Sequence, residues 1–204
     1  MKPRAQAFPH TAASKASAPR GAGEVRIIGG QWRRTKLPVA LKPGLRPTPD
    51  RVRETLFNWL GQSLVGWRCA DVFAGTGALG LEAASRGAAL VQLCEQDRAL
   101  VQQLQAHVTR LQASQVRVTQ GDGLAWLTQQ PAASWDLIFL DPPFDAQLFA
   151  PALQAAAKAM AVNGWVYLEA PQPWDVNQLA PLGLQVHRHL QAGAVHAHLL
   201  QRVA

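Results

Sequence analysis

The run Asp141-Pro142-Pro143-Phe144 has the composition of a site that acts on a flat amine. Two consecutive prolines hold φ at about −65°, and Pro142 confines Asp141 to extended conformations, so the Asp141 carboxylate and the Pro142 carbonyl point in fixed directions. Two rigid acceptors aimed at the N–H bonds of an exocyclic amine favour the geometry in which its nitrogen becomes nucleophilic, and Phe144 can stack on the attached ring. The run therefore predicts a catalytic site for such an amine.

A second group of residues forms a glycine-rich turn after an acid. Asp71 is followed by Gly75, Gly77 and Gly80 in the run DVFAGTGALG, and Glu95 lies 20 residues beyond Gly75. This spacing fits the G-x-G-x-x-G turn of nucleotide-binding sites. Asp71 beside the turn disfavours a pyrophosphate and favours a ligand with cationic centres, such as the ammonium and sulfonium groups of S-adenosylmethionine. No Gly-Lys-Ser or Gly-Lys-Thr follows, so a P-loop is not indicated.

These residues need a sheet to place them together. Strands are predicted over 68–73, 89–95, 116–119, 135–140 and 165–169, and helices over 78–85, 98–111, 124–129 and 150–161. Alternating strands and helices predict a doubly wound, mostly parallel α/β sheet. Two last strands, over 184–190 and 195–203, have no helix between them and should form an antiparallel edge pair.

Four acids follow the predicted strands at or near their ends. They are Asp71, Glu95, Asp122 and Asp141. Ligands of an open α/β sheet bind outside the carboxyl ends of its strands, so these acids should line one cleft. Glu95 suits ribose hydroxyls, and Asp122 suits the amino group of an adenine.

Positive charge is concentrated near the N-terminus. The chain of 204 residues carries a net charge of +7, yet its first 53 residues contain 12 basic and 2 acidic side chains. This excess predicts an arm that contacts a polyanion, with a solubilising tail as the alternative. We expect residues 1–24 to be a disordered basic tail, because prolines interrupt the amphipathic helix that a transit peptide would need.

The arm itself is predicted as a β-hairpin with extended flanks over residues 25–48. Strands over 25–28 and 32–37 flank Gly29 and Gly30, and the tip carries Trp32, Arg33, Arg34 and Lys36, a mixture suited to phosphates and an unpaired base. A helix over 49–60 follows, with Thr48 as its N-cap. Its polar face carries Arg51, Glu54 and Asn58.

Cysteines and histidines give weaker signals. Cys69 and Cys94 lie in strand-like runs and are expected as buried thiols of a reducing cytoplasm. No apolar run approaches the ~20 residues that span a bilayer.

Two His-x-His pairs, at 187 and 189 and at 196 and 198, could bind zinc or nickel. We expect no metal, since no Cys or carboxylate accompanies the pairs and they lie away from the predicted cleft.

The sequence resembles the class I S-adenosylmethionine-dependent methyltransferases and, more closely, the RsmD-like family. Four runs carry the resemblance, in the order RIIGGQWRRTKL, RPTPDRVRETLFNWL, DVFAGTGALGLEAASRGA and FLDPPF, within roughly residues 25 to 203. That family methylates the exocyclic N2 of one guanine in bacterial small-subunit (16S) ribosomal RNA. Leu200 stands where we would expect an aromatic residue in the last strand.

The resemblance implies a seven-stranded sheet in a methyltransferase domain over 49–204. It also implies sets of site residues. The cofactor, S-adenosyl-L-methionine, would be held by Asp71, Phe73, Gly75, Thr76, Gly77, Glu95, Asp122 and Gly123. The target guanine would be held by Asp141, Pro142, Pro143 and Phe144. RNA would be contacted by Trp32, Arg33, Arg34, Lys36, Arg46, Arg51 and Arg53. We expect a cytoplasmic monomer that acts on small-subunit ribosomal RNA or a 30S assembly particle, with no membrane and no obligatory protein partner.

Other functions remain open at this point. The Asp-Pro-Pro-Phe run also suits methylation of adenine or cytosine in DNA or of a protein glutamine. A nicotinamide-dependent oxidoreductase would explain the glycine turn but would leave Asp71 and the Asp-Pro-Pro-Phe run without a role. A non-catalytic RNA-binding assembly factor is a third alternative.

Overall fold

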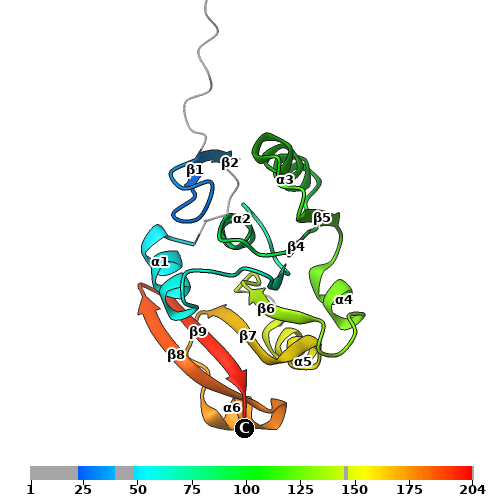
Figure 1. Cartoon of the computed structure of the whole chain (residues 1–204). Coiled ribbons are helices and arrows are strands. Elements are labelled where there is room, and N and C mark those ends of the chain that lie inside the picture. Colours follow the sequence, from blue (N-terminus) through cyan, green and yellow to red (C-terminus); the bar gives the residue numbers. More distant parts are fainter. Residues whose placement is uncertain (1–22, 40–47, 145–146, 204) are drawn as a thin grey trace, which may run out of the picture.

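The computed structural model describes residues 23–39, 48–144 and 147–203. A seven-stranded sheet of order β5-β4-β3-β6-β7-β9-β8 carries helices on both faces, and a separate two-stranded sheet, β1-β2, lies beside it (Figure 1). The strands are β1 (Gly23–Arg26), β2 (Lys36–Val39), β3 (Arg68–Asp71), β4 (Leu90–Glu95), β5 (Val116–Gln120), β6 (Trp135–Leu140), β7 (Met160–Ala170), β8 (Leu184–Ala192) and β9 (Val195–Arg202). The helices are α1 (Asp50–Trp59), α2 (Ala78–Ser85), α3 (Arg98–Leu111), α4 (Gly123–Thr128), α5 (Phe149–Ala159), α6 (Val176–Leu179) and the 3₁₀ turn η1 (Ala180–Leu182).

The predicted doubly wound α/β class is confirmed. Strands β3 to β7 pair in parallel, whereas β9 pairs antiparallel with both β7 and β8. The expected edge hairpin is therefore present, although a register shift interrupts it between Val186 and Arg188. Leu200, where we expected an aromatic residue, is fully buried, so a smaller side chain is accommodated there.

Each face of the large sheet has its own hydrophobic core. Side chains of α1, α2 and α3 cover one face, where Leu56, Leu81 and Leu104 are buried against Phe139. Helices α4, α5 and α6 cover the other face. Phe139 meets Phe57 of α1 and, edge to face, Tyr167 of β7, with ring centroids 6.4 and 6.2 Å apart. This packing fixes β6 and β7 side by side, and with them the residues that follow each strand.

The arm differs from its predicted form. Its strands pair from Gly23 opposite Val39 to Arg26 opposite Lys36, further from the tip than expected. The intervening loop is held by backbone bonds, including Ile27 N–H to the Thr35 carbonyl at 2.9 Å. The strands that we predicted over 25–28 and 32–37 thus become a wide loop between two shorter strands. Propensity could not show this, because the loop takes its shape from the helix on which it packs.

The start of helix α1 differs from the prediction. Pro49, not Thr48, is its N-cap residue, and no side chain caps the helix. Thr48 is buried and hydrogen-bonds Glu169 instead. The predicted polar face of α1 is exposed, as expected, with Arg51, Glu54 and Asn58 in water.

Both cysteines are free and buried, as predicted. Burial raises the pKa of the Cys94 thiol to about 12, so it stays protonated and unreactive. Among the residues that the structure describes, no helix is long and apolar enough to cross a membrane.

Candidate active site

Three acids meet at the carboxyl end of the central strands. Asp71 ends β3 and pairs with Phe139 of β6, and Leu140 of β6 pairs with Leu168 of β7. The next residue on each of these two strands is an acid, so Asp141 and Glu169 come side by side on one face of the sheet. The sequence predicted Asp71 and Asp141 at this edge, and the structure places them there.

Asp71 is almost fully buried under the start of α2. Its Oδ2 accepts a hydrogen bond from the Gly80 N–H at 2.9 Å. Burial raises the pKa of Asp71 to about 7; the bond from Gly80 lowers it, and the charges of Glu95 and Glu169 raise it further. A carboxylate whose charge is this poorly stabilised by its protein surroundings suits a cationic ligand.

The glycine turn takes its shape from its glycines. Gly77 has φ of 77° and precedes the first residue of α2. A Cβ at Gly80 would lie 2.2 Å from a Leu93 methyl group, so the helix can approach the strand only with glycine there. Thr76 is buried in the turn and Phe73 is half-buried. Gly77 therefore supplies the left-handed conformation of the turn, and Gly80 allows the close approach of α2 to β4.

The other two predicted cofactor acids stand at neighbouring strand ends. Glu95 accepts hydrogen bonds from the N–H groups of Gly75 and Asp97, both at 2.8 Å, so it closes the glycine turn on β4. Asp122 is the N-cap of α4, where Oδ1 accepts the N–H groups of Leu124 and Ala125. Both carboxylates are thus held at the cleft by backbone bonds.

Gly123, in the same turn as Asp122, permits a close contact with β3. A Cβ at this position would lie 1.9 Å from the Val72 carbonyl oxygen. The helix that Asp122 caps is therefore held directly against the strand that ends at Asp71.

The Asp-Pro-Pro-Phe run leaves β6 toward the same edge. Asp141 is half-buried and Pro142 is buried, whereas Pro143 and Phe144 face solvent, Phe144 with 41% of its surface exposed. The Phe144 ring lies 6.3 Å from that of Phe149. Burial raises the pKa of Asp141 well above its usual value, and the charges of Glu169 and Asp71 raise it further. An exposed aromatic ring beside a carboxylate can receive a flat base from outside.

Glu169 is a site residue that the sequence analysis missed. It is 4% exposed, and its Oε1 accepts the Tyr167 hydroxyl at 2.8 Å. The signal was present, because Glu169 ends a predicted strand as the other four acids do. It was overlooked because no glycine or proline motif follows it.

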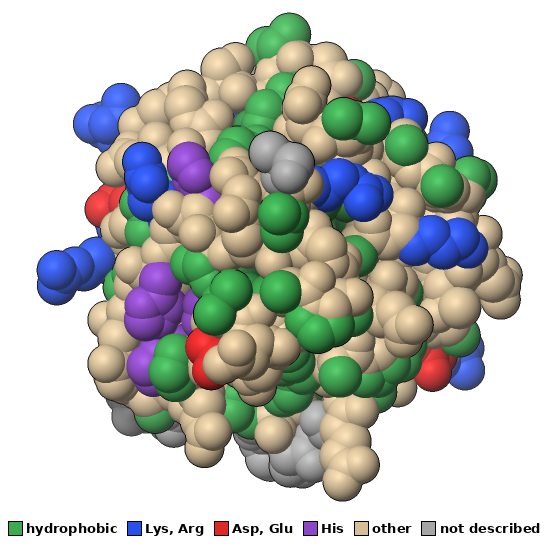
Figure 2. Space-filling view, turned by 90° about the horizontal axis from the view of Figure 1, so that it is seen from below, with side chains coloured by type: hydrophobic (Ala, Val, Ile, Leu, Met, Phe, Trp, Pro, Cys, Tyr) green, Lys and Arg blue, Asp and Glu red, His purple; other side chains and the backbone are tan. Residues whose placement is uncertain are grey.

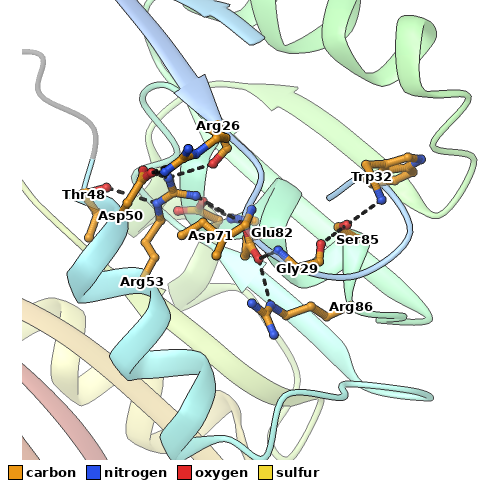
Figure 3. Close-up of polar contacts among 12 residues, drawn as sticks. Arg26, Gly29, Trp32, Thr48, Asp50, Arg53, Asp71, Glu82, Ser85 and Arg86 are labelled. Carbon is orange, nitrogen blue, oxygen red and sulfur yellow. Dashed lines mark hydrogen bonds and ion pairs between the residues drawn. The ribbon is translucent and has the colours of Figure 1, made fainter. Parts of the chain in front are cut away.

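A second missed residue, Glu82, joins the arm to the domain (Figure 3). Its buried carboxylate accepts the backbone N–H groups of Ile28 and Gly29, at 2.8 and 2.7 Å. It also pairs with the guanidinium groups of Arg86 at 2.8 Å and Arg53 at 3.3 Å. An acid in the otherwise apolar helix ALGLEAAS was the available sequence signal.

Arg53 corrects one of the RNA predictions. Its side chain is 1% exposed and bonds Glu82, Asp50, the Thr48 carbonyl and the Arg26 carbonyl (Figure 3). A side chain enclosed in this way cannot reach a nucleic acid on the surface. Helical spacing does place Arg53 on the buried side of α1, with Leu56 and Phe57, but the acids that balance its charge there, Glu82 and Asp50, were not recognised as its partners.

The remaining cations that we expected to contact RNA lie on the surface. Arg33, Arg34 and Arg51 are exposed, and Trp32 is half-buried with its ring against the core. Lys36 is exposed but pairs with Glu24 at 2.6 Å. Arg46 lies outside the described residues.

The arm lies along α2, and this orientation separates its tip from the cleft. Val25 and Val39 pack on Ala78 at the start of α2, next to the glycine turn. Gly30 lies against the Ser85 carbonyl at the end of the helix, where a Cβ would come within 1.8 Å. Seven steps of helix rise place these ends about 10 Å apart. The tip with Arg33 therefore lies about one length of α2 away from the glycine turn.

The histidines form a patch on the face seen in Figure 2. His189 Nε2 lies 3.0 Å from His196 Nδ1, with nearly parallel rings, and the His198 ring lies 4.7 Å from that of His189. His198 accepts the Trp174 N–H, and burial lowers its pKa to about 4. His187 contacts Trp165 instead. Among the described residues, no group of His, Cys, Asp and Glu has an arrangement that could hold a metal.

The charges of the cleft fit the cofactor that the sequence suggested. Asp71, Asp141 and Glu169 gather there, and in the described part of the chain no ion pair joins any of them to a cation. A ligand with an ammonium and a sulfonium would supply the missing positive charge.

Fold and site together define a methyltransferase of the doubly wound type, with a seven-stranded sheet and an Asp-Pro-Pro-Phe run at the carboxyl edge of its parallel strands. A family model described as "Conserved hypothetical protein 95" matches residues 25–201, and the chain belongs to this family. The chain is 44% identical over 190 residues to ribosomal RNA small subunit methyltransferase D of Escherichia coli (strain K12), covering 90% of this chain and 93% of the relative.

Further comparisons agree. The protein of the same name from Haemophilus influenzae is 38% identical over 194 residues, covering 87% of this chain and 98% of the relative. The solved structure of yhhF from Escherichia coli superposes with a TM-score of 0.77 at 40% identity, covering 88% of this chain and 98% of that one. The RsmD-like resemblance read from the sequence is thus confirmed.

Proposed function

We propose that this chain transfers a methyl group from S-adenosyl-L-methionine to the exocyclic N2 of a guanine in small-subunit ribosomal RNA. The observation that carries the proposal is the position of Asp141 and Pro142 at the end of β6, one strand from the end of β3 and the glycine turn that follows it. This position puts two fixed acceptors at the edge where a cofactor would lie. The named activity of the relatives from Escherichia coli and Haemophilus influenzae supports the choice of ribosomal RNA.

The bound cofactor would supply an electrophilic methyl group on a sulfonium. Asp71 would accept its ammonium, Glu95 its ribose hydroxyls and Asp122 its adenine amino group, each from a strand end or helix cap that is already rigid. Asp141 and the Pro142 carbonyl would accept the two N–H bonds of the guanine amine. Phe144 would stack on the base and exclude water.

The guanine must leave its stack to reach this cleft. Unstacking a base costs a few kcal/mol, which phosphate contacts elsewhere on the protein can offset. The exposed cations Arg33, Arg34 and Arg51 are the candidates for such contacts. Their distance from the cleft implies that the RNA extends along α2 and α1.

The proposal is tested by methyl transfer from radiolabelled cofactor. Small-subunit RNA, small subunits from a strain that lacks the enzyme, and duplex DNA are offered side by side, and labelled nucleosides are then identified. We expect N2-methylguanosine from one of the two RNA substrates. Asp141→Ala should abolish methyl transfer and leave cofactor affinity nearly unchanged. The control variant Asp136→Asn, which replaces an acid at the start of β6, should retain activity.

Other results would select the alternatives. Label in DNA or in methyladenosine would indicate a DNA or adenine methyltransferase, and full activity of Asp141→Ala would refute the assigned site. Stabilisation by a nicotinamide nucleotide rather than by S-adenosylmethionine would favour the oxidoreductase. Cofactor binding without transfer to any substrate would favour a binding role.

A further inference from the structure

Glu169 and Asp141 occupy equivalent positions on neighbouring strands. The register pairs Phe139 with Tyr167 and Leu140 with Leu168, so the following pair, Asp141 and Glu169, projects from the same face as the two rings. Asp141 is half-buried at the carboxyl end of β6, and Glu169 beside it is buried. Two carboxyl groups in this arrangement cannot both ionise freely.

The surroundings of the two acids differ. Glu169 receives hydrogen bonds from two neutral hydroxyl groups, those of Tyr167 and Thr48. Among the described residues, no hydroxyl group donates a hydrogen bond to Asp141. Hydrogen bonds to a carboxylate stabilise its charged form, so the negative charge is favoured on Glu169 and a proton on Asp141.

From this arrangement we infer that Glu169 is a positioning residue, which acts through Asp141 by holding a buried negative charge beside it. The inference rests on the proposed function and names a further residue for it. Glu169 raises the proton affinity of Asp141 and thereby makes Asp141 the acceptor for the proton that the reacting amine must lose.

Shifts of pKa agree with this division of roles. The pKa of Asp141 is raised well above its usual value by burial and then by Glu169 and Asp71. Burial also raises the pKa of Glu169, but the hydroxyls of Tyr167 and Thr48 lower it. The titratable groups that face this pair are Asp71 from β3, with Glu95 of β4 behind it, and Tyr167 from β7.

In the proposed transfer, the lone pair of the guanine N2 would form the new N–C bond to the methyl carbon. The C–S bond would break with its electron pair staying on sulfur, which would become a neutral thioether. The nitrogen is then positively charged and gives one proton to the Asp141 carboxylate. Before that step, the cationic cofactor favours ionised Asp141, and Glu169 keeps it basic enough to take the proton.

The experiment compares variants of Glu169 and Tyr167 by two readouts. Glu169→Gln removes the charge and keeps the shape, and Tyr167→Phe removes one donor to Glu169. The titration midpoint of the Asp141 carboxyl is measured by carbon-13 NMR in the full chain, with Asp141→Asn to assign the signal. The pH dependence of kcat/KM for methyl transfer is measured on the RNA substrate that the wild-type protein prefers.

We expect the Asp141 midpoint to fall by at least one pH unit in Glu169→Gln, and the acid limb of kcat/KM to move to lower pH with it. In Tyr167→Phe, the Asp141 midpoint should fall and that of Glu169 should rise. Glu169→Asp, which keeps the charge, should restore most of the wild-type midpoint. A residue with only a structural role would change stability without moving these values.

An Asp141 midpoint that is unchanged in Glu169→Gln overturns the inference. If Glu169→Gln does not fold, Tyr167→Phe decides through the same titration. If wild-type protein transfers no methyl group to RNA, the proposed function fails, and the NMR midpoints still show whether Glu169 controls the proton on Asp141. The two failures are therefore distinguishable.

Discussion

The Arg53 guanidinium lies 3.3 Å from the Glu82 carboxylate, and both side chains are almost completely buried. This ion pair joins α1 to α2, and the same carboxylate receives two N–H groups of the arm. Arg86 completes the set and also lies 4.6 Å over the Phe57 ring. The arm, the first helix and the helix after the glycine turn therefore share one buried charge.

Removing that carboxylate should strongly destabilise the protein. Glu82→Ala leaves two guanidinium groups and two N–H groups in the interior without their acceptor, and loss of one partner of a buried pair costs about 3–5 kcal/mol. We expect the free energy of unfolding in urea to fall by at least this amount. Glu54→Ala, on the exposed face of α1, is the matched control and should change stability by less than about 0.5 kcal/mol. Equal stability of the two variants would contradict the role of Glu82.

Without added cofactor, Asp71 should make the protein less stable as pH rises. Its folded pKa of about 7 exceeds the ordinary 3.8, so between about pH 4 and 7 the folded state binds a proton that the unfolded state lacks. Stability is then lost as pH rises through that window, by about 4 kcal/mol in total at about 1.4 kcal/mol per pKa unit. Unfolding of wild type and Asp71→Asn is compared from pH 4 to 8, and the difference between them should shrink or reverse with this slope.

Asp136 offers a control, because its effect on the pH dependence of stability has the opposite sign to that of Asp71. Hydrogen bonds and the charge of Arg68 hold the pKa of Asp136 below its usual value despite partial burial, so Asp136 contributes stability that is lost as pH falls. Asp136→Asn should therefore remove a contribution to stability that increases with pH, which is the reverse of the effect of Asp71. A wild-type curve parallel to that of Asp71→Asn would show that Asp71 is ionised in both states.

The loop of the arm should contribute to RNA affinity through charge alone. Arg33 and Arg34 are exposed, so replacing both by Ala removes two phosphate contacts without disturbing the core. The slope of log affinity against log salt should fall by roughly 1.4 to 1.8, at about 0.7 to 0.9 per contact. Affinity is measured on small-subunit RNA from low to moderate salt. Replacing Arg117 and Arg188, which are exposed on other strands, should leave the slope unchanged, and a double variant that keeps the wild-type slope would refute the RNA role of the loop.

Much of the fold could be predicted from hydrophobic periodicity and from the residues that end helices and strands. The predicted helices over 78–85 and 98–111 and the strand over 135–140 have the bounds that the structure gives them. The strand-end rule also located Asp71 and Asp141, because a buried parallel strand is an apolar run whose end is easily recognised. Such features depend on local pattern, and local pattern was sufficient.

Features that depend on tertiary contacts were mispredicted or missed. The loop of the arm takes its conformation from the end of α2, on which it packs: Gly29 and Gly30 lie against Arg86 and Ser85. Arg53 looked like a surface cation until its partner Glu82 was located on another helix. The edge hairpin carries a register shift that separates His187 from the other three histidines, and no two-residue pattern could show it.

The packing of the arm on α2 limits which arms from related proteins could replace it in a chimaera. Ile27 and Leu37 of the arm belong to the same hydrophobic core as the first helices, and Glu82 depends on the arm for two of its hydrogen bonds. Cutting the chain between arm and domain would uncover apolar surface and leave a buried carboxylate short of donors. An arm from a relative could replace this one only together with matching residues at the end of α2, so the two segments must vary as one unit.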